Sequence, residues 1–123
     1  MIADKLVKSW LPSLATFCML FALFIGGAQE GAGSLFPSPW DKLAHIVFFF
    51  CLTIFLSAGF NFSIVITVLL ALLIGILDEF HQIILPGRFA GVDDWLADVF
   101  GVMLAVGFII FKIKSNKNSL LGL

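Results

Sequence analysis

Between residues 41 and 98, acidic, basic and imidazole side chains occur in three short segments of an otherwise largely apolar sequence. Charge inside hydrocarbon is costly, so each of these residues needs a physical reason to be there. A cation can hold a phosphate or carboxylate, and an imidazole or carboxylate can accept a proton from a reacting group. The chemistry on offer is therefore binding, or proton transfer, at a polar headgroup. The candidate binding residues are Asp41, Lys42, His45, Glu79, Gln82, Arg88, Asp94 and Asp98.

Two of these residues, His45 and Glu79, are the candidate catalytic bases, with Arg88 available to stabilise developing negative charge. No Ser-His-Asp or Cys-His constellation is evident, so headgroup binding is favoured over hydrolysis or transfer. A metal site that combines His45 and Glu79 with Asp94 and Asp98 is a further alternative. No His-x-x-x-His or Cys-x-x-Cys spacing supports it, and we predict neither a metal nor another cofactor.

Composition assigns the chain to the membrane. Of its 123 residues, 61% are hydrophobic and 12% are charged, which is too little polar surface to cover a soluble domain. A hydrocarbon core of about 30 Å needs roughly 20 helical residues, so the length allows four spans in one domain, residues 1–123. The fold class predicted is an all-α bundle of four transmembrane helices. The expected spans are residues 10–28, 41–60, 62–85 and 94–111.

The boundaries of these spans follow from turn-forming residues and from length. Residues 29–40 are rich in glycine, proline and serine and are expected to form a surface loop, after which Asp41 is a plausible helix N-cap. The charge-free part of the third run is too short to cross a membrane, so that helix must continue through Glu79 to about Leu85, where Pro86 and Gly87 end it. A cleavable signal peptide is the alternative for the first run, whose length favours a span.

Lysines indicate the orientation of the bundle. Lys5 and Lys8 precede the first span, and Lys112, Lys114 and Lys117 follow the last, so both termini are predicted to be cytoplasmic. The polar segments then lie together at the outer side of the membrane. The net charge of −1 and the absence of a basic tract give no indication of nucleic-acid binding.

Helical spacing predicts that the polar residues meet. On each of the last three helices they recur at intervals of three or four, which places them on one face, and small residues continue the row and allow close helix contact. The rows are Asp41 and His45 on the second span, Thr67, Ala71, Gly75, Glu79 and Gln82 on the third, and Asp94, Asp98, Gly101 and Ala105 on the fourth. We expect a polar pocket that opens outward.

The same residues resemble the signature of the VanZ-like family of small bacterial membrane proteins. The matching pieces are Asp41-Lys42-x-x-His45, Glu79-x-x-Gln82, Pro86-Gly87-Arg88 and Asp94-x-x-x-Asp98-x-x-Gly101, in order and on successive hydrophobic spans. Many family members have asparagine at the Asp98 position, so no role that requires a neutral amide is carried over. Asp78, His81 and Asp93 lie outside the pattern and are expected to face interfacial water.

The resemblance implies a cellular context. The family is similar to a protein that accompanies glycopeptide-resistance clusters and lowers susceptibility to teicoplanin, a lipoglycopeptide antibiotic. It implies a multi-pass protein of the bacterial cytoplasmic membrane. The partners expected are membrane lipids and an outer-leaflet amphiphile, either a lipid-linked wall precursor or a lipoglycopeptide.

Structural roles are the alternative to a ligand site. Lys42 and Arg88 on the outer side are expected to form ion pairs with acidic neighbours, and Glu79, Arg88 and Asp94 alone would make a salt-bridge network that closes three helix ends. A subunit that holds a larger membrane partner, or a homo-oligomer, is also open. An ion channel is disfavoured because the charges do not line the full depth of the spans.

Overall fold

The computed structural model describes residues 2–123, with side chains described from Trp10 onward. The described elements are the helices α1 (Ile2–Phe24), α2 (Trp40–Phe60), α3 (Ile64–Ile84) and α4 (Val92–Leu121), with two short 3-10 helices, η1 (Gly26–Ala28) and η2 (Ala32–Ser34), between α1 and α2. Four of these helical segments are long and apolar enough to cross a membrane. The predicted all-α, four-span fold class is confirmed.

The start of α2 differs from the prediction, the start of α3 is defined by a side-chain cap, and the end of α3 agrees with the prediction. The N-cap of α2 is Pro39, with no side-chain hydrogen bond, so Asp41 lies inside the first turn and its predicted capping role is wrong. At the start of α3, Ser63 accepts a hydrogen bond from the Ile66 N–H. Helix α3 ends at Ile84, before Pro86 and a Gly87 with φ of 73°, as predicted.

Helix α4 is longer than the apolar pattern indicated. It was expected to end near Phe111, but it continues to Leu121. It stops at Gly122, whose backbone lies in the left-handed region, with φ of 70°, which glycine adopts readily. The residues between are lysine, asparagine, serine and aliphatic residues, none of which breaks a helix. The end of the apolar run therefore did not mark the end of the helix, which comes at a glycine.

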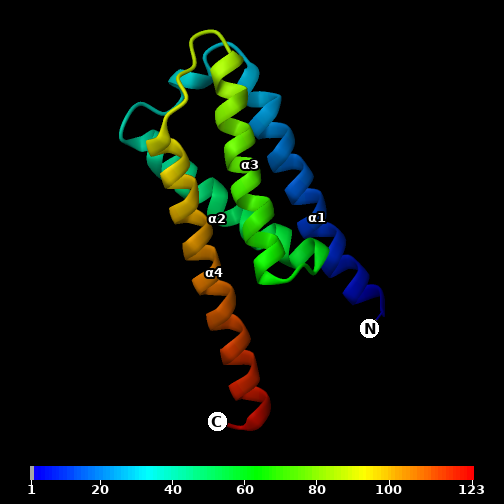
Figure 1. The fold of residues 1–123 in the computed structure, drawn as a ribbon. Coiled ribbons are helices and arrows are strands. Elements are labelled where there is room, and N and C mark those ends of the chain that lie inside the picture. Colours follow the sequence, from blue (N-terminus) through cyan, green and yellow to red (C-terminus); the bar gives the residue numbers. More distant parts are fainter. Residues whose placement is uncertain (1) are drawn as a thin grey trace.

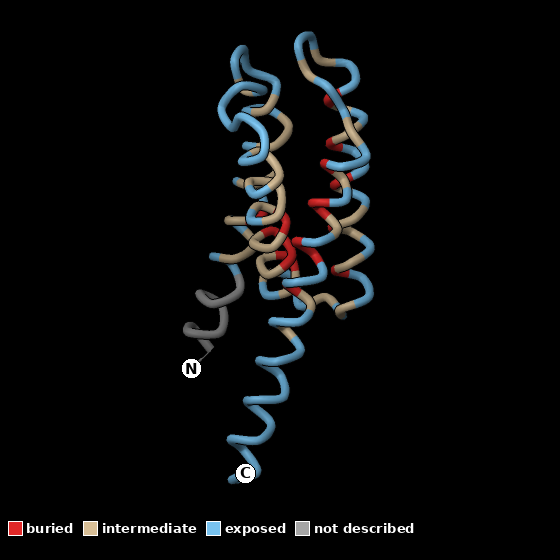
Figure 2. Tube along the Cα trace, turned by 90° about the vertical axis from the view of Figure 1, so that its left-hand side faces the viewer, coloured by how far each residue is buried: buried red, intermediate tan, exposed pale blue. Residues whose placement is uncertain are grey.

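The helices alternate in direction, so that α2 and α4 run parallel and both start at the polar end (Figure 1). Helix α2 packs against α1, α3 and α4 and is the central element of the bundle. Its buried residues Phe49, Leu52 and Leu56 form a core with Ala71 and Val102. Figure 2 shows that the buried positions face the middle of the bundle, while the other described positions are intermediate or exposed.

Small and polar residues line the helix interfaces, and large apolar side chains cover the outer surface. Lipid tails are as apolar as leucine, so burying leucine gives little association energy in a membrane and close backbone packing matters more. At Gly101 a Cβ atom would meet the Ile46 carbonyl and would lie 3.1 Å from the Phe50 backbone nitrogen. At Gly59 it would lie 2.6 Å from the backbone nitrogen of Ser13. These glycines set the distances of α4 and α1 from α2.

We expect Gly101→Ala to lower the melting temperature of the purified protein and Gly107→Ala to leave it equal or higher. Both changes gain helix propensity worth about 1 kcal/mol. Only at Gly101 does the added methyl collide with backbone atoms of α2, an overpacking that costs about 1–3 kcal/mol. Thermal unfolding of the two variants in one detergent measures this. Equal melting temperatures would contradict the close-contact interpretation.

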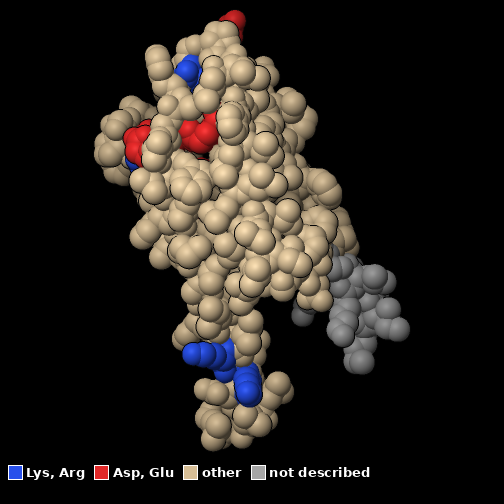
Figure 3. Space-filling model, in the orientation of Figure 1, with Lys and Arg blue, Asp and Glu red and all other residues tan. Residues whose placement is uncertain are grey.

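The orientation of the bundle in the membrane stays a prediction. The N- and C-termini lie at one end, and the acidic residues gather at the other, as Figures 1 and 3 show. Lys112, Lys114 and Lys117 lie on the terminal end, whereas Lys5 and Lys8 have side chains outside the described residues.

We therefore expect an impermeant maleimide to label Phe89→Cys in intact cells and to label Ser119→Cys only after lysis, both in a background without Cys18 and Cys51. Phe89 is 88% exposed in the loop between α3 and α4, and Ser119 is exposed near the end of α4. The reverse labelling pattern would show that the polar end faces the cytoplasm.

Candidate functional site

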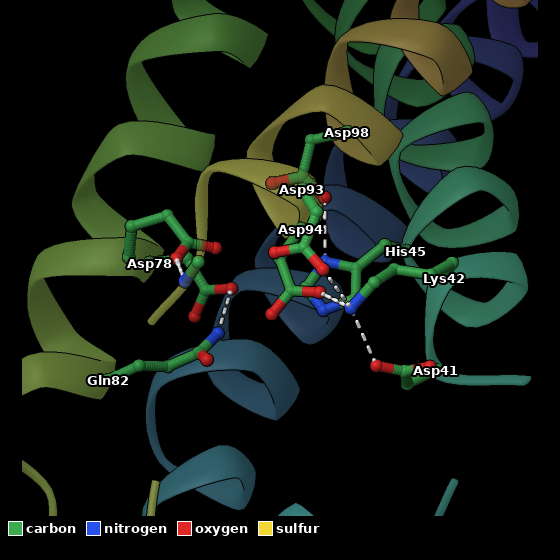
Figure 4. Close-up of polar contacts among 10 residues, drawn as sticks. Asp41, Lys42, His45, Asp78, Gln82, Asp93, Asp94 and Asp98 are labelled. Carbon is green, nitrogen blue, oxygen red and sulfur yellow. Dashed lines mark hydrogen bonds and ion pairs between the residues drawn. The ribbon is translucent and has the colours of Figure 1, made fainter. Parts of the chain in front are cut away.

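The Lys42 ammonium lies among three carboxylates at the polar end of α2 and α4 (Figure 4). Its Nζ atom is 2.8 Å from Asp41 Oδ2 and 3.2 Å from Asp93 Oδ2, and it also forms an ion pair with Asp94. Asp94 is nearly buried, whereas the Asp93 side chain is 70% exposed and is the outermost member. Lys42 thus forms the acidic ion pairs predicted for it.

One turn deeper, α2 and α4 meet again through His45 and Asp98. The Nδ1 atom of His45 lies 2.7 Å from Asp98 Oδ1. Asp98 is fully buried, and its Oδ2 has no hydrogen-bond partner among the described residues. With Nδ1 engaged, Nε2 is the ring nitrogen left for another group. The structure therefore brings together the α2 and α4 residues whose spacing predicted a shared site.

Helix α3 contributes Asp78 and Gln82 to the site. The buried position of Asp78 differs from the prediction made from the sequence. Asp78 is 2% exposed and accepts a hydrogen bond from Gln82 Nε2 at 3.0 Å, so the expectation that it faces water is wrong. The buried row on α3 runs Thr67, Ala71, Gly75, Asp78, Gln82. At about 100° per residue, position 78 falls inside the arc set by the small residues, while position 79 lies about 100° further round. The angular position of Asp78 relative to these small residues was therefore the signal in the sequence that it is buried.

Glu79 lies on the flank of α3 and holds the start of α4. Its Oε2 accepts a hydrogen bond from the Gly91 backbone N–H at 2.9 Å, next to the first turn of α4, where the helix dipole favours negative charge. Arg88 donates from Nη1 to the Gly27 carbonyl at 3.4 Å, and within the part of the chain described it has no carboxylate at ion-pair distance. Glu79, Arg88 and Asp94 each bind elsewhere, so the alternative network of these three residues does not form.

A polar cavity of about 260 Å³ opens between the loops and the ends of α2, α3 and α4. The loop between α1 and α2 contributes Gly33 and Phe36 to its rim, and the loop between α3 and α4 contributes Phe89. Lys42 and Asp98 do not line this cavity, but they contact the lining residues Asp94 and His45. Glu79 lines a different groove, between α3 and α4. The predicted residues that line the cavity are Asp41, His45, Gln82, Arg88 and Asp94.

An apolar groove of about 520 Å³ lies beside this cavity, between α1 and α2. It extends from Trp40 to Cys51 along α2 and shares two lining residues, Phe36 and Ala44, with the polar cavity. A smaller hollow of about 140 Å³ is lined by His45 and Ala44 together with apolar side chains. His45 therefore borders polar space on one side and apolar space on the other.

The described residues hold no group of three or more histidine, cysteine, aspartate or glutamate side chains arranged to bind a metal ion. The structure thus gives no ligand set for the metal alternative. Cys18 is exposed and Cys51 is half-buried, and neither forms a disulfide.

The family model described as VanZ/LLP1 matches residues 4–114 of this sequence. The chain belongs to the VanZ/LLP1 family. The match includes the first three candidate spans, most of the fourth and every residue of the site, so the resemblance carried by the motifs is confirmed. Comparison with curated proteins and with solved structures found no match. The protein is a VanZ-like protein with four membrane-spanning helices.

We expect Lys42→Gln to destabilise this VanZ-like protein by about 1–3 kcal/mol, because it leaves the nearly buried Asp94 carboxylate without its cation, while Asp41 and Asp93 remain more accessible to water. The double variant Lys42→Gln with Asp94→Asn should recover about 1–3 kcal/mol, since the two residues contact each other. Lys112→Gln, at an exposed position over Phe108, is the matched control and should melt like the parent. Additive effects of the Lys42 and Asp94 changes in unfolding measurements would show that their contact contributes nothing.

Proposed function

We propose that this protein binds an amphiphile, with the headgroup in the polar cavity and one apolar chain in the groove between α1 and α2. The observation that carries the proposal is that the two spaces adjoin and share part of their lining. Phe36 and Ala44 line both, so a molecule with a polar end and an apolar end fits across that junction. Ligand sites combine apolar walls with a few convergent polar groups, as here.

Arg88 is the group that would hold the anionic part of the headgroup. Among described residues it is the cation that lines the cavity, while the Lys42 ammonium is already bound to three carboxylates. The contact of Arg88 with the Gly27 carbonyl is long at 3.4 Å, so the guanidinium keeps donors for a phosphate or carboxylate. This narrows the earlier expectation, in which Lys42 shared that role.

Selectivity should come from the headgroup. An acyl chain that leaves the bilayer for the groove exchanges one apolar environment for another and gains little free energy. Charge-assisted hydrogen bonds inside a region of low dielectric are strong, so phosphate or carboxylate recognition supplies most of the affinity. The groove then admits amphiphiles of different chain length.

The occupant follows from the predicted orientation and from the family. With the polar end outward, the cavity faces the outer leaflet of the bacterial cytoplasmic membrane, where envelope lipids, lipid-linked wall precursors and lipoglycopeptides such as teicoplanin are found. Binding of such a headgroup would connect this member to lipoglycopeptide resistance. A role as a subunit of a larger membrane complex is the alternative, and it needs neither the cavity nor the groove.

We expect Val47→Phe and Arg88→Gln to lose bound lipid, as measured by native mass spectrometry after purification in mild detergent. Val47 is 54% exposed on the groove, so a larger side chain fills the groove without entering the core. Loss of one charge-assisted contact at Arg88 should weaken retention of phosphate-containing lipid about 10-fold or more. Val65→Phe, at a 68% exposed position of α3 away from the groove, is the control and should retain lipid like the parent.

Equal lipid retention by the parent, Val47→Phe and Arg88→Gln would contradict the proposal and favour the subunit role. The same conclusion follows if the parent retains no lipid and binds neither added phospholipid nor teicoplanin.

A further inference from the structure

We propose that His45, positioned by Asp98, is the general base for hydrolysis of a phosphodiester in the bound headgroup. This inference rests on the proposed function, because the headgroup must first occupy the polar cavity. It adds a reaction and a substrate class, namely phospholipids whose phosphate carries a second alcohol.

The first support is the geometry of the pair. Asp98 Oδ1 lies 2.7 Å from His45 Nδ1, and the carboxylate is fully buried between α3 and α4. In a neutral ring this contact places the proton on Nδ1 and leaves Nε2 as an acceptor. A buried carboxylate on Nδ1 also orients the ring and stabilises the imidazolium that forms when Nε2 accepts a proton.

The second support is the position of His45 at a polar–apolar boundary. Its side chain lines the polar cavity and also the small hollow formed with Leu23, Phe48 and Phe49. The phosphate of a phospholipid lies at the same kind of boundary, between the headgroup alcohol and the apolar tail. A lipid that spans the junction at Ala44 therefore brings its phosphate next to His45.

The third support is what the described cavity wall lacks. It contains no serine, threonine, cysteine or tyrosine, and its carboxylates, Asp41 and Asp94, are bound to Lys42. No hydroxyl or thiol of this wall can therefore form a covalent intermediate, and with His45 Nε2 assigned to proton transfer the nucleophile of the proposed reaction is water.

The step balances without a further reactant. A water oxygen attacks phosphorus while His45 Nε2 takes one of its protons, and the bond between phosphorus and the headgroup alcohol oxygen breaks. The imidazolium then returns the proton to that oxygen. Arg88 holds the phosphoryl oxygens, where negative charge develops. The products are a lipid phosphomonoester and the free alcohol.

Two glycines allow the pair to form. The missing side chain of Gly101 brings α4 against the α2 backbone at Ile46, the residue after His45. At Gly75 a Cβ atom would lie 3.2 Å from Asp98 Oδ2, so any side chain there would press on the carboxylate. The same small-residue row that packs the helices thus fixes the ring.

The test uses the full chain in vesicles of phosphatidylglycerol and, separately, of phosphatidylethanolamine. Mass spectrometry follows the released glycerol or ethanolamine and the phosphatidic acid. We expect His45→Gln to lower kcat about 10²–10⁴-fold and Asp98→Asn to lower kcat at least about tenfold with KM changed less than about twofold. Added imidazole should restore turnover to His45→Ala.

Matched controls separate chemistry from folding. His81→Gln removes the other histidine, which packs edge-on against Phe24, and Glu30→Gln removes an exposed carboxylate outside the site. Both should keep the rate of the parent. Nitrogen-15 NMR of the unsubstituted chain, with His81→Gln for assignment, should show His45 Nδ1 carrying a proton, a readout that needs no variant at the site.

Each other outcome is decisive. A parent that binds lipid but releases no alcohol from either lipid overturns this inference and leaves the binding function standing, whereas a parent that binds no lipid overturns both. Unchanged turnover in His45→Gln, or an unprotonated Nδ1, shows that the pair only joins α2 to α4.

Discussion

The close parallel contact between α2 and α4 is the constraint on which the site depends. Both helices rise by the same amount per residue, so steps of three or four residues on one match those on the other. Lys42 therefore meets Asp94, and His45 meets Asp98, one turn apart. A lysine can reach across a wide gap, but a histidine and an aspartate are short. Their contact requires the backbone approach that Gly101 permits.

The same contact between α2 and α4 brings charged side chains together at the polar end of the bundle. Six acidic side chains and two cations, Lys42 and Arg88, lie at or near the polar ends of three helices. Membrane helices gain little from burying apolar surface against one another, so packing of small residues and polar contacts must hold the bundle together. A cluster with so few cations is a poor device for that purpose, since desolvating charges is expensive. The proposed ligand site would give these costly charges a role that stability alone does not.

Sequence patterns predicted the four spans and the meeting of α2 with α4, because both depend on local periodicity and on small residues. They did not give the surroundings of individual side chains. Asp78 was missed because two adjacent acidic residues competed for one stripe, and only the phase of the whole helix decides between them. Arg88 was expected beside a carboxylate, yet its partner is the Gly27 backbone carbonyl, which no side-chain pattern encodes. The cavity itself depends on two loops folding toward each other.

The arrangement of groups around the cavity separates recognition from reaction. The cation that faces the space comes from the loop after α3, whereas the histidine comes from α2 and is held by α4. A loop can adjust to headgroups of different size, because loops move more easily than packed helices. The imidazole cannot follow such movement, since Asp98 and the glycine contacts fix it. In the proposed reaction, a ligand held by Arg88 would therefore meet a base of fixed position, and only a ligand whose phosphate reaches the lining shared at Ala44 would come within its range.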